Sequence, residues 1–387
     1  MLSNKPLSGI TVVEIGHSIA APYAGMILAG LGANLIKVES PGSGDYARSW
    51  GPPFWDGAAP HFAAMNRNKR GVIVDMNDPA QRARLEALII DEADAVICNL
   101  RPGSIDRHGL GGDALVARKP GLIYCDIGAF GSGGPLSGLP GYDPLMQAFG
   151  GLMSITGEAE GRPPIRVPIS MVDMGAGLWA AVGIMGALLE RNRTGQGGRI
   201  ETSLYETALA WTAIPIASVL IAPRVMKPQG SGASGIVPYQ AFLATDGWIV
   251  IGAGNDNLFR KLARALARPD LEADPRFATN ADRVRNREIL VPLLEVEVAQ
   301  RSIAEMRALL DEAGVPNAPV QRIDQVVEEP HAKALGIIQP GPEGALPTVG
   351  LPLRFDGARP PYERAAPRLG QHTHELPDPA ASEAAGT

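Results

Sequence analysis

The sequence is poor in cysteine, and no metal-ligand spacing surrounds the two cysteines that it has. Its 387 residues contain only Cys98 and Cys125, so a disulfide framework is excluded. Each cysteine ends a short apolar run that is typical of a buried strand, which predicts two core thiols. We expect no metal site and no permanently bound cofactor. A reducing cytoplasm fits this cysteine usage.

Net positive charge and long apolar runs are also missing. The chain has 35 basic and 41 acidic residues, and its net charge of -6 disfavours nucleic acid and anionic membranes as partners. Met174–Leu189 and Ala208–Ala222, the latter broken by Pro215, fall short of the roughly 18 apolar residues that suggest a membrane span. We predict buried helices there. The residues from Met1 to Leu7 do not resemble a signal peptide.

The first half of the chain alternates apolar, β-branched runs with helical patterns, at intervals of about 25 to 35 residues. This rhythm is typical of a parallel sheet with crossover helices, and Pro22–Leu31 is the helix expected after the first strand. The fold class is therefore α/β with a Rossmann-like parallel sheet. The predicted strands are Ile10–Ile15, Asn34–Glu39, Gly71–Asp75, Ala95–Asn99, Leu122–Ile127 and Arg199–Ser203.

The pattern changes after residue 222. A glycine- and serine-rich loop, Gly230–Gly235, precedes a predicted strand pair, Tyr239–Ala244 and Trp248–Gly252, and then charged amphipathic helices. We expect residues 1–222 to form a large domain, residues 223–329 a smaller α+β domain, and residues 330–387 a segment that returns to the large domain. The last ten residues resemble a frayed tail.

Small residues follow the first predicted strand, from Ile15 to Pro22, where a helix begins. Ligands of open α/β sheets bind at this edge, and a helix start offers free N–H groups to phosphate. The GxGxxG fingerprint is absent, which disfavours a nicotinamide dinucleotide. Basic residues follow later elements at Arg48, Asn66–Arg70, Asn99–Gly103 and Arg107. Each alone is typical of a solvated surface charge, but together they indicate a phosphate-bearing ligand.

Asp173 stands directly before the long apolar segment. Ser170 and Asp173 have the spacing of a capping box, which gives the carboxylate a purely structural explanation. The functional alternative uses the same place, because the amino end of a helix favours an ionised carboxylate and so a nucleophile in its reactive form.

Six segments in order give the chain its resemblance to the class III CoA-transferases, the CaiB/BaiF family that includes formyl-CoA transferase. Asp173 stands at the position of that family's catalytic aspartate. The resemblance covers nearly the whole chain. The segments are Leu31–Glu39, Asn66–Arg70, Asn99–Gly103, Gly141–Asp143, Arg193–Gly197 and Leu369–His372.

The resemblance implies that Asp173 attacks an acyl-CoA thioester and then carries CoA as an aspartyl thioester. Coenzyme A and acyl-CoA are then substrates, bound by the large domain. This sequence departs from the family pattern at Ser40. The family member from oxalate metabolism has an arginine near this position that helps to hold CoA. Lys37, Arg48 or Lys69 is expected to replace that arginine. The residues implied at the CoA site by position are Ser18, Ile19, Ala20, Asn99, Leu100, Arg107 and Tyr142.

The main alternative is an α-methylacyl-CoA racemase, which shares the fold and the aspartate. Racemases carry histidine at the position of Tyr142, and tyrosine is a poor base at neutral pH. His17 and His61 do not occupy the matching place. A non-catalytic acyl-CoA binding protein and an unrelated oxidoreductase are weaker alternatives.

The resemblance also implies a homodimer of interlocked chains, with Gly230–Gly235 as a mobile loop over the site. As acceptor we expect a small carboxylic acid, with a weak preference for a dicarboxylate and for succinyl-CoA as donor.

Overall fold

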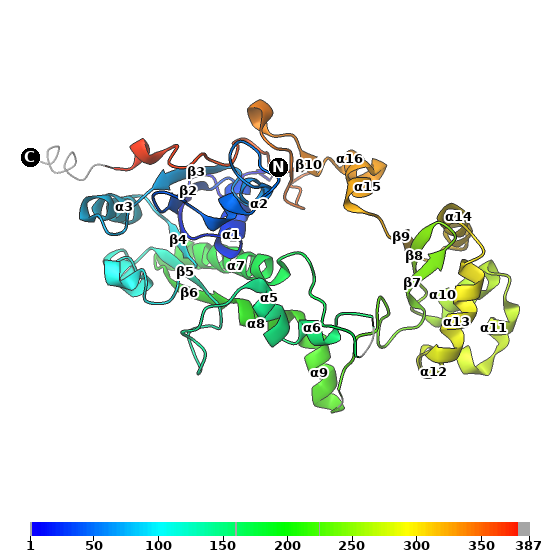
Figure 1. Cartoon of the computed structure of the whole chain (residues 1–387). Coiled ribbons are helices and arrows are strands. Elements are labelled where there is room, and N and C mark those ends of the chain that lie inside the picture. Colours follow the sequence, from blue (N-terminus) through cyan, green and yellow to red (C-terminus); the bar gives the residue numbers. More distant parts are fainter. Residues whose placement is uncertain (1, 159–160, 224, 378–387) are drawn as a thin grey trace, which may run out of the picture. The chain divides into compact units, whose positions relative to one another are not determined.

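A computed structural model describes residues 2–158, 161–223 and 225–377. The chain divides into two compact units (Figure 1). The first unit comprises Met1–Leu152, Arg166–Pro223 and Pro330–Thr387, and the second comprises Met153–Ile165 and Arg224–Glu329. The first unit holds the sheet and every feature of the candidate site described below.

The first unit is built on a six-stranded sheet in which every neighbouring pair of strands is parallel. The strand order is β3-β2-β1-β4-β5-β6, so the order reverses between β1 and β4. The predicted fold class is confirmed. The strands are β1 (Thr11–Ile15), β2 (Asn34–Glu39), β3 (Lys69–Ile73), β4 (Ala95–Cys98), β5 (Ile123–Gly128) and β6 (Gly198–Ser203).

Helices cover both faces of this sheet, because its strands are apolar on both sides. Alternate strand residues enter two separate cores. One core contains Val12, Leu35 and Ile97 with α1 (Ala20–Gly30) and α7 (Met171–Thr194), and the other contains Val13, Ile36 and Val96 with α3 (Pro79–Asp91) and α4 (Gly112–Arg118). Cys98 and Cys125 are buried free thiols in β4 and β5, as predicted.

Helices α1 and α7 approach each other closely at Gly177. A Cβ atom at this position would lie 2.5 Å from the carbonyl oxygen of Ala20 and 3.1 Å from the backbone nitrogen of Ala24. No larger residue fits without moving one helix, so Gly177 sets the distance between them. Because Asp173 lies one turn before Gly177 on α7, the same contact places Asp173 beside the start of α1.

The segment after residue 330 packs against the free edge of β3. The backbone N–H of His372 donates to the Gly71 carbonyl (2.8 Å), and the Gly71 N–H donates to Nδ1 of His372 (3.1 Å). The motif around His372 is therefore structural. The shorter elements of the first unit are η1 (Tyr46–Ser49), α2 (Pro60–Met65), η2 (Asp106–His108), α5 (Asp143–Phe149), α8 (Leu204–Trp211), α9 (Ala213–Ile221), α16 (Pro330–Leu335), β10 (Ile338–Gln339), η4 (Pro342–Gly344), β11 (Thr348–Val349) and η5 (Thr373–Glu375).

The second unit has its own core between an antiparallel sheet and a set of helices. Arg287 donates to the side chain of Gln229 and to the carbonyl of Ala233, and so ties down the loop Gly230–Gly235 within this unit. Its elements are β7 (Tyr239–Ala244), β8 (Gly247–Gly252), β9 (Asn317–Pro319), α10 (Asp256–Ala265), α11 (Pro269–Ala273), η3 (Pro275–Phe277), α12 (Asn280–Arg285), α13 (Arg287–Val298), α14 (Ile303–Ala313) and α15 (Ile323–Glu328); α6 (Leu152–Ile155) lies at the boundary.

The two long apolar segments differ from the prediction of fully buried helices. By length and composition α7 is a candidate membrane span, and the bent pair α8 and α9 passes the same test together. Helix α7 is a core helix on one side, because it packs on α1, β5 and β6. Helix α9 has no buried residue, and Ile214, Leu220 and Ile221 are 81%, 78% and 84% exposed. The prediction was wrong for α9, since none of its residues is buried within the part of the chain that the structure describes.

We predict that a second copy of the chain covers the apolar face of α9. Leu220→Glu together with Ile221→Glu should convert dimer to monomer, because two charges cannot be buried in an apolar contact. Light scattering after gel filtration measures the mass. The matched control is Leu243→Glu on the second unit, which is 51% exposed and should leave the mass unchanged. A wild-type monomer, or wild-type protein that floats with lipid vesicles, would contradict the prediction.

Candidate active site

A cavity of about 170 Å³ opens at the carboxyl edge of the parallel sheet. Its walls come from the loops after β1 and β4, between which the strand order reverses, so neighbouring loops diverge and leave a crevice. The segment after β2, the end of β5, the segment 138–142, Leu204 at the start of α8 and the first turn of α7 also line it. The lining residues used below are His17, Ser18, Ile19, Ala20, Tyr46, Trp50, Asn99, Leu100, Arg101, Leu139, Tyr142 and Asp173.

Asp173 is held on the cavity wall by the amino end of α7, but the cap of that helix differs from the prediction. Ser170 is the N-cap residue, and its side chain makes no capping hydrogen bond. Asp143 supplies the cap instead, because its Oδ2 accepts from the backbone N–H groups of Val172 (2.7 Å) and Asp173 (3.4 Å). The predicted capping box was wrong: a carboxylate distant in sequence, 1% exposed, occupies that place.

The environment of Asp173 keeps part of its carboxyl group protonated near neutral pH. Burial, and then the negative charge of Asp143, raise the pKa of Asp173 to about 7. We expected the helix end to keep this carboxylate fully ionised, but burial and a neighbouring acid act in the opposite direction. A partly protonated carboxyl group in a small cavity is typical of functional sites.

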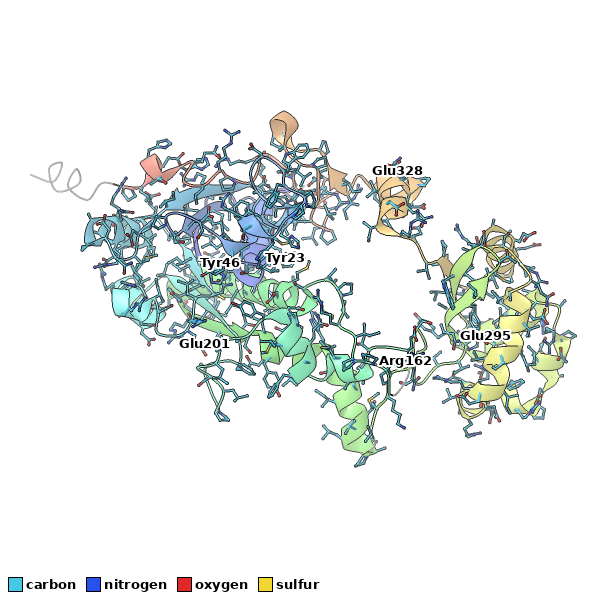
Figure 2. All side chains as sticks on the ribbon, in the orientation of Figure 1. Tyr23, Tyr46, Arg162, Glu201, Glu295 and Glu328 are labelled. Atoms are coloured by element: carbon cyan, nitrogen blue, oxygen red, sulfur yellow. The ribbon has the colours of Figure 1, made fainter. Side chains whose placement is uncertain are left out.

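The loop after β1 faces Asp173 across the cavity. His17 lies 4.7 Å from the ring of Tyr46, measured between ring centroids, and its Nδ1 is 2.9 Å from the hydroxyl of Ser18. Burial lowers the pKa of His17, despite the opposing charge of Asp45. The imidazole is therefore mostly neutral at pH 7. Tyr46 is labelled in Figure 2.

The cavity brings together most of the residues that the sequence analysis selected. Seven of them line it: Ser18, Ile19, Ala20, Asn99, Leu100, Tyr142 and Asp173. Lys37, Arg48, Lys69 and Arg107 are not among its lining residues.

Lys37 and Lys69 are fully buried, so neither can reach a phosphate group. Lys37 Nζ lies 2.9 Å from Glu14 and 2.8 Å from Asp45, and Lys69 Nζ lies 2.6 Å from the other oxygen of Glu14. Strand alternation explains Lys37, which shares with Leu35 the face of β2 that packs on α1. Lys69 belongs to β3, which begins two residues earlier than predicted.

The two arginines have different surroundings. Arg48 forms a double hydrogen bond with Glu39 (2.8 and 2.7 Å) and covers the ring of Phe62 at 3.7 Å, so its charge is already neutralised. Arg107 lies in η2, is exposed, and donates to His108 (3.2 Å). Arg107 remains a candidate for phosphate contact, and Arg48 does not.

Sequence reasoning missed several lining residues. His17, Tyr46, Trp50, Arg101 and Leu139 all face the cavity. The signal for His17 and Arg101 was available, because both lie inside segments that were singled out. Tyr46, Trp50 and Leu139 lie in loops without regular pattern, and only the tertiary structure brings them to the site. Among the residues that the structure describes, no group of three or more His, Cys, Asp or Glu side chains could hold a metal ion.

The fold and this cavity define an α/β protein with a ligand site at the switch point of its sheet. Residues 7–373 match the sequence profile of CoA-transferase family III. The succinyl-CoA:glutarate CoA-transferase of Mus musculus is 37% identical over 97% of this chain and 86% of that protein. The succinate–glutarate CoA-transferase of Agrobacterium fabrum is 33% identical over 96% of this chain and 94% of that protein.

The structure agrees with these sequence matches. A crystal structure of a CaiB/BaiF family protein from Brucella suis has a TM-score of 0.85 and 37% sequence identity, covering 99% of this chain and 100% of that one. The chain belongs to CoA-transferase family III. It is a class III CoA-transferase, with CoA thioesters as substrates.

We predict that Asp143 controls the ionisation of Asp173. In Asp143→Asn the side-chain oxygen still accepts from Val172, but the negative charge is gone, so the pKa of Asp173 should fall below 7. We expect Asp173 to attack a thioester only when it is ionised, so wild-type kcat/KM should rise about tenfold from pH 6 to pH 8. The variant should reach its plateau at lower pH.

The control for this prediction is Asp143→Ala, which removes the charge and also the cap. It should shift the pH profile in the same direction and should also lower stability by about 1 kcal/mol. An Asp143→Asn profile that superimposes on the wild-type profile would show that the charge of Asp143 does not reach Asp173.

Proposed function

We propose that the enzyme moves CoA from succinyl-CoA to a small dicarboxylic acid through a thioester on Asp173. One observation carries the proposal: the cavity has a single carboxylate among its lining residues, at the start of α7 and opposite the loop after β1. The relatives named for glutarate transfer support the donor and the class of acceptor.

The proposed chemistry exchanges one acyl bond at each step. A carboxylate oxygen of Asp173 attacks the thioester carbonyl, the C–S bond breaks, and CoA leaves as a thiolate. The thiolate attacks the Asp173 carbonyl of the mixed anhydride and releases the donor acid. The acceptor carboxylate then attacks the Asp173 thioester, the C–S bond breaks, and a second mixed anhydride and CoA thiolate form. The thiolate finally attacks the acceptor's carbonyl in this anhydride, and the Asp173 carboxylate leaves. No net proton is consumed.

The size of the cavity fits the reacting end of the substrate. Its volume of about 170 Å³ is below the roughly 300 Å³ at which pockets begin to enclose drug-sized ligands. The thioester and a short acyl group therefore enter, and the nucleotide part of CoA lies outside. Limited space also restricts water, which would hydrolyse both the anhydride and the thioester.

The start of α1 supports the charged intermediates of this reaction. The first N–H groups of a helix have no acceptor within the helix, and α1 begins at Ala20 on the cavity wall. Such donors stabilise an oxyanion by a few kcal/mol each when they are aimed at it. Arg101 also lines the cavity, and we propose its guanidinium as the counter-ion for the second carboxylate of a dicarboxylate.

The test is chemical trapping of the intermediate. Wild-type enzyme is mixed with succinyl-CoA alone and then treated with hydroxylamine or borohydride. The thioester on Asp173 should become a hydroxamate or an alcohol, and peptide mapping should find this product on Asp173. Asp173→Asn, which preserves the volume of the side chain, should give no product and lower kcat at least about 10⁴-fold. Asp143→Asn is the matched control and should still be trapped.

A panel of substrates distinguishes CoA transfer from α-methylacyl-CoA racemisation. With succinyl-CoA as donor, glutarate and other short dicarboxylates should gain CoA, which mass spectrometry detects. Arg101→Gln should raise KM for a dicarboxylate more than for a monocarboxylate. Full turnover in Asp173→Asn, or solvent deuterium entering a 2-methylacyl-CoA while no acid accepts CoA, would contradict the proposed function.

A further inference from the structure

The loop after β1 has a strained shape that something must hold. Ser18 has a φ of 69°, in the left-handed region that residues other than glycine rarely adopt. Gly16 is equally constrained, because a Cβ atom there would lie 2.6 Å from Oδ1 of Asn99. A loop of this shape persists only where its surroundings fix it. It also carries three of the residues that line the cavity opposite Asp173.

Three side chains form hydrogen bonds with the backbone of this loop. Nζ of Lys37 donates to the Gly16 carbonyl (3.0 Å), and Oδ1 of Asp45 accepts from the Ser18 N–H (2.8 Å). Between these two contacts, Asn99 accepts from the His17 N–H (3.0 Å) and donates to the His17 carbonyl (2.9 Å). Four consecutive polar groups of the backbone are thus held by side chains.

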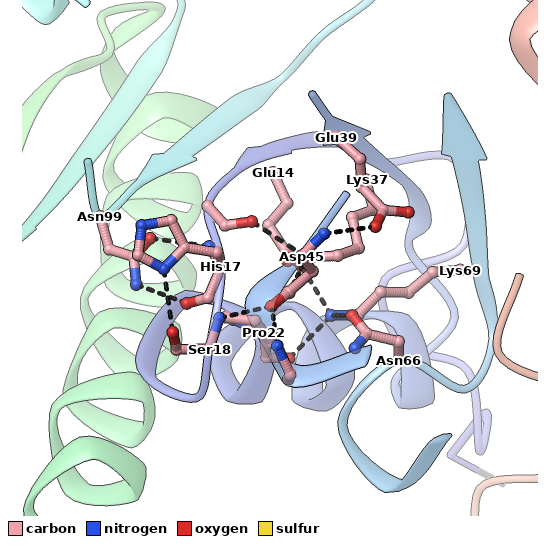
Figure 3. Close-up of polar contacts among 12 residues, drawn as sticks. Glu14, His17, Ser18, Pro22, Lys37, Glu39, Asp45, Asn66, Lys69 and Asn99 are labelled. Atoms are coloured by element: carbon pink, nitrogen blue, oxygen red, sulfur yellow. Dashed lines mark hydrogen bonds and ion pairs between the residues drawn. The ribbon is translucent and has the colours of Figure 1, made fainter. Parts of the chain in front are cut away.

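These side chains come from both neighbours of β1 in the sheet. Lys37 lies in β2 and Asp45 in the loop after it, whereas Asn99 follows β4. Asp45 and Asn99 approach the loop from opposite sides (Figure 3). Oδ1 of Asp45 also accepts from the Ala47 N–H (2.9 Å), while Oδ2 lies 2.8 Å from Nζ of Lys37. Asp45 therefore joins the loop to the buried lysine.

We propose that Asp45 and Lys37 are positioning residues for acyl-CoA: they hold Gly16–Ser18 in the shape that faces Asp173, although neither touches the ligand. Their side chains are completely buried. A buried ion pair is a poor source of stability, because apolar residues of the same volume often do as well. Here the charged groups also bind backbone atoms of the site, which apolar residues cannot do.

Lys69 belongs to the same network and offers a matched comparison. Like Lys37 it is fully buried and pairs with Glu14. Its remaining contacts are the Pro22 carbonyl (2.8 Å) and the side chain of Asn66 (2.9 Å). Loss of Lys69 therefore disturbs the same buried charges but no backbone atom of Gly16–Ser18.

The experiment compares Asp45→Ala, Asp45→Asn and Lys69→Met by calorimetric binding of CoA and by hydrogen exchange of the peptide that contains Ser18. Asp45→Ala should weaken CoA binding about tenfold and speed exchange at Ser18. Asp45→Asn, which keeps an acceptor oxygen, should lie between Asp45→Ala and wild type, and it decides the matter if Asp45→Ala does not fold. Lys69→Met should lower Tm but leave the Kd for CoA within about twofold.

Two results would overturn the proposal. One is wild-type CoA affinity in the Asp45 variants, and the other is an equal loss of affinity in Lys69→Met, which would mean that general destabilisation is responsible. The proposal rests on the proposed function only in placing the thiol end of CoA in this cavity. CoA binding and amide exchange require no chemistry at Asp173, so a failure to trap the aspartyl thioester contradicts the proposed function alone.

Discussion

The close contact between α1 and α7 is the constraint on which the site depends. At Gly177 the two helices are so close that an added Cβ atom would lie 2.5 Å from the carbonyl oxygen of Ala20. Because both helices begin at the same end of the sheet, their amino termini meet there as well. One terminus carries Asp173, and the other follows the strained loop at Ser18. A larger residue at Gly177 would move Asp173 away from the start of α1 without changing any residue that lines the cavity.

Two buried carboxylates near this contact, Asp143 and Asp45, have different neighbours and different effects. Asp143 lies beside another acid: burial of Asp173, and then the negative charge of Asp143, raise the pKa of Asp173 to about 7. Asp45 is an acid beside a cation. Burial alone would raise its pKa, but the charge of Lys37 lowers the pKa below its ordinary value. Asp45 thus remains ionised and accepts from backbone amides, whereas the Asp173 carboxyl group is partly protonated near neutral pH.

The buried lysines show where prediction from sequence failed. Lys37 and Lys69 were selected as phosphate ligands because basic residues near a ligand-binding edge attract phosphate. In the fold they pair with Glu14 instead, and burial lowers the pKa of Lys69 to about 8 even with Glu14 beside it. Gly25 belongs to the same arrangement, since a Cβ there would lie 2.2 Å from the Glu14 carboxylate. Such a network joins three strands and a helix, and no local pattern predicts it.

The sequence by itself determined the parallel sheet, the strand positions to within about two residues, and the family, because apolar runs separated by helical patterns, and motifs in a fixed order, are properties of the sequence alone. It also pointed to Asp173. Only the tertiary structure decided which carboxylate caps α7, which basic side chains are already paired with carboxylates, and which aromatic side chains reach the cavity. Those outcomes depend on contacts between residues distant in the chain: Asp143 reaches the start of α7 from 30 positions away, and burial together with the charge of Asp143 raises the pKa of Asp173.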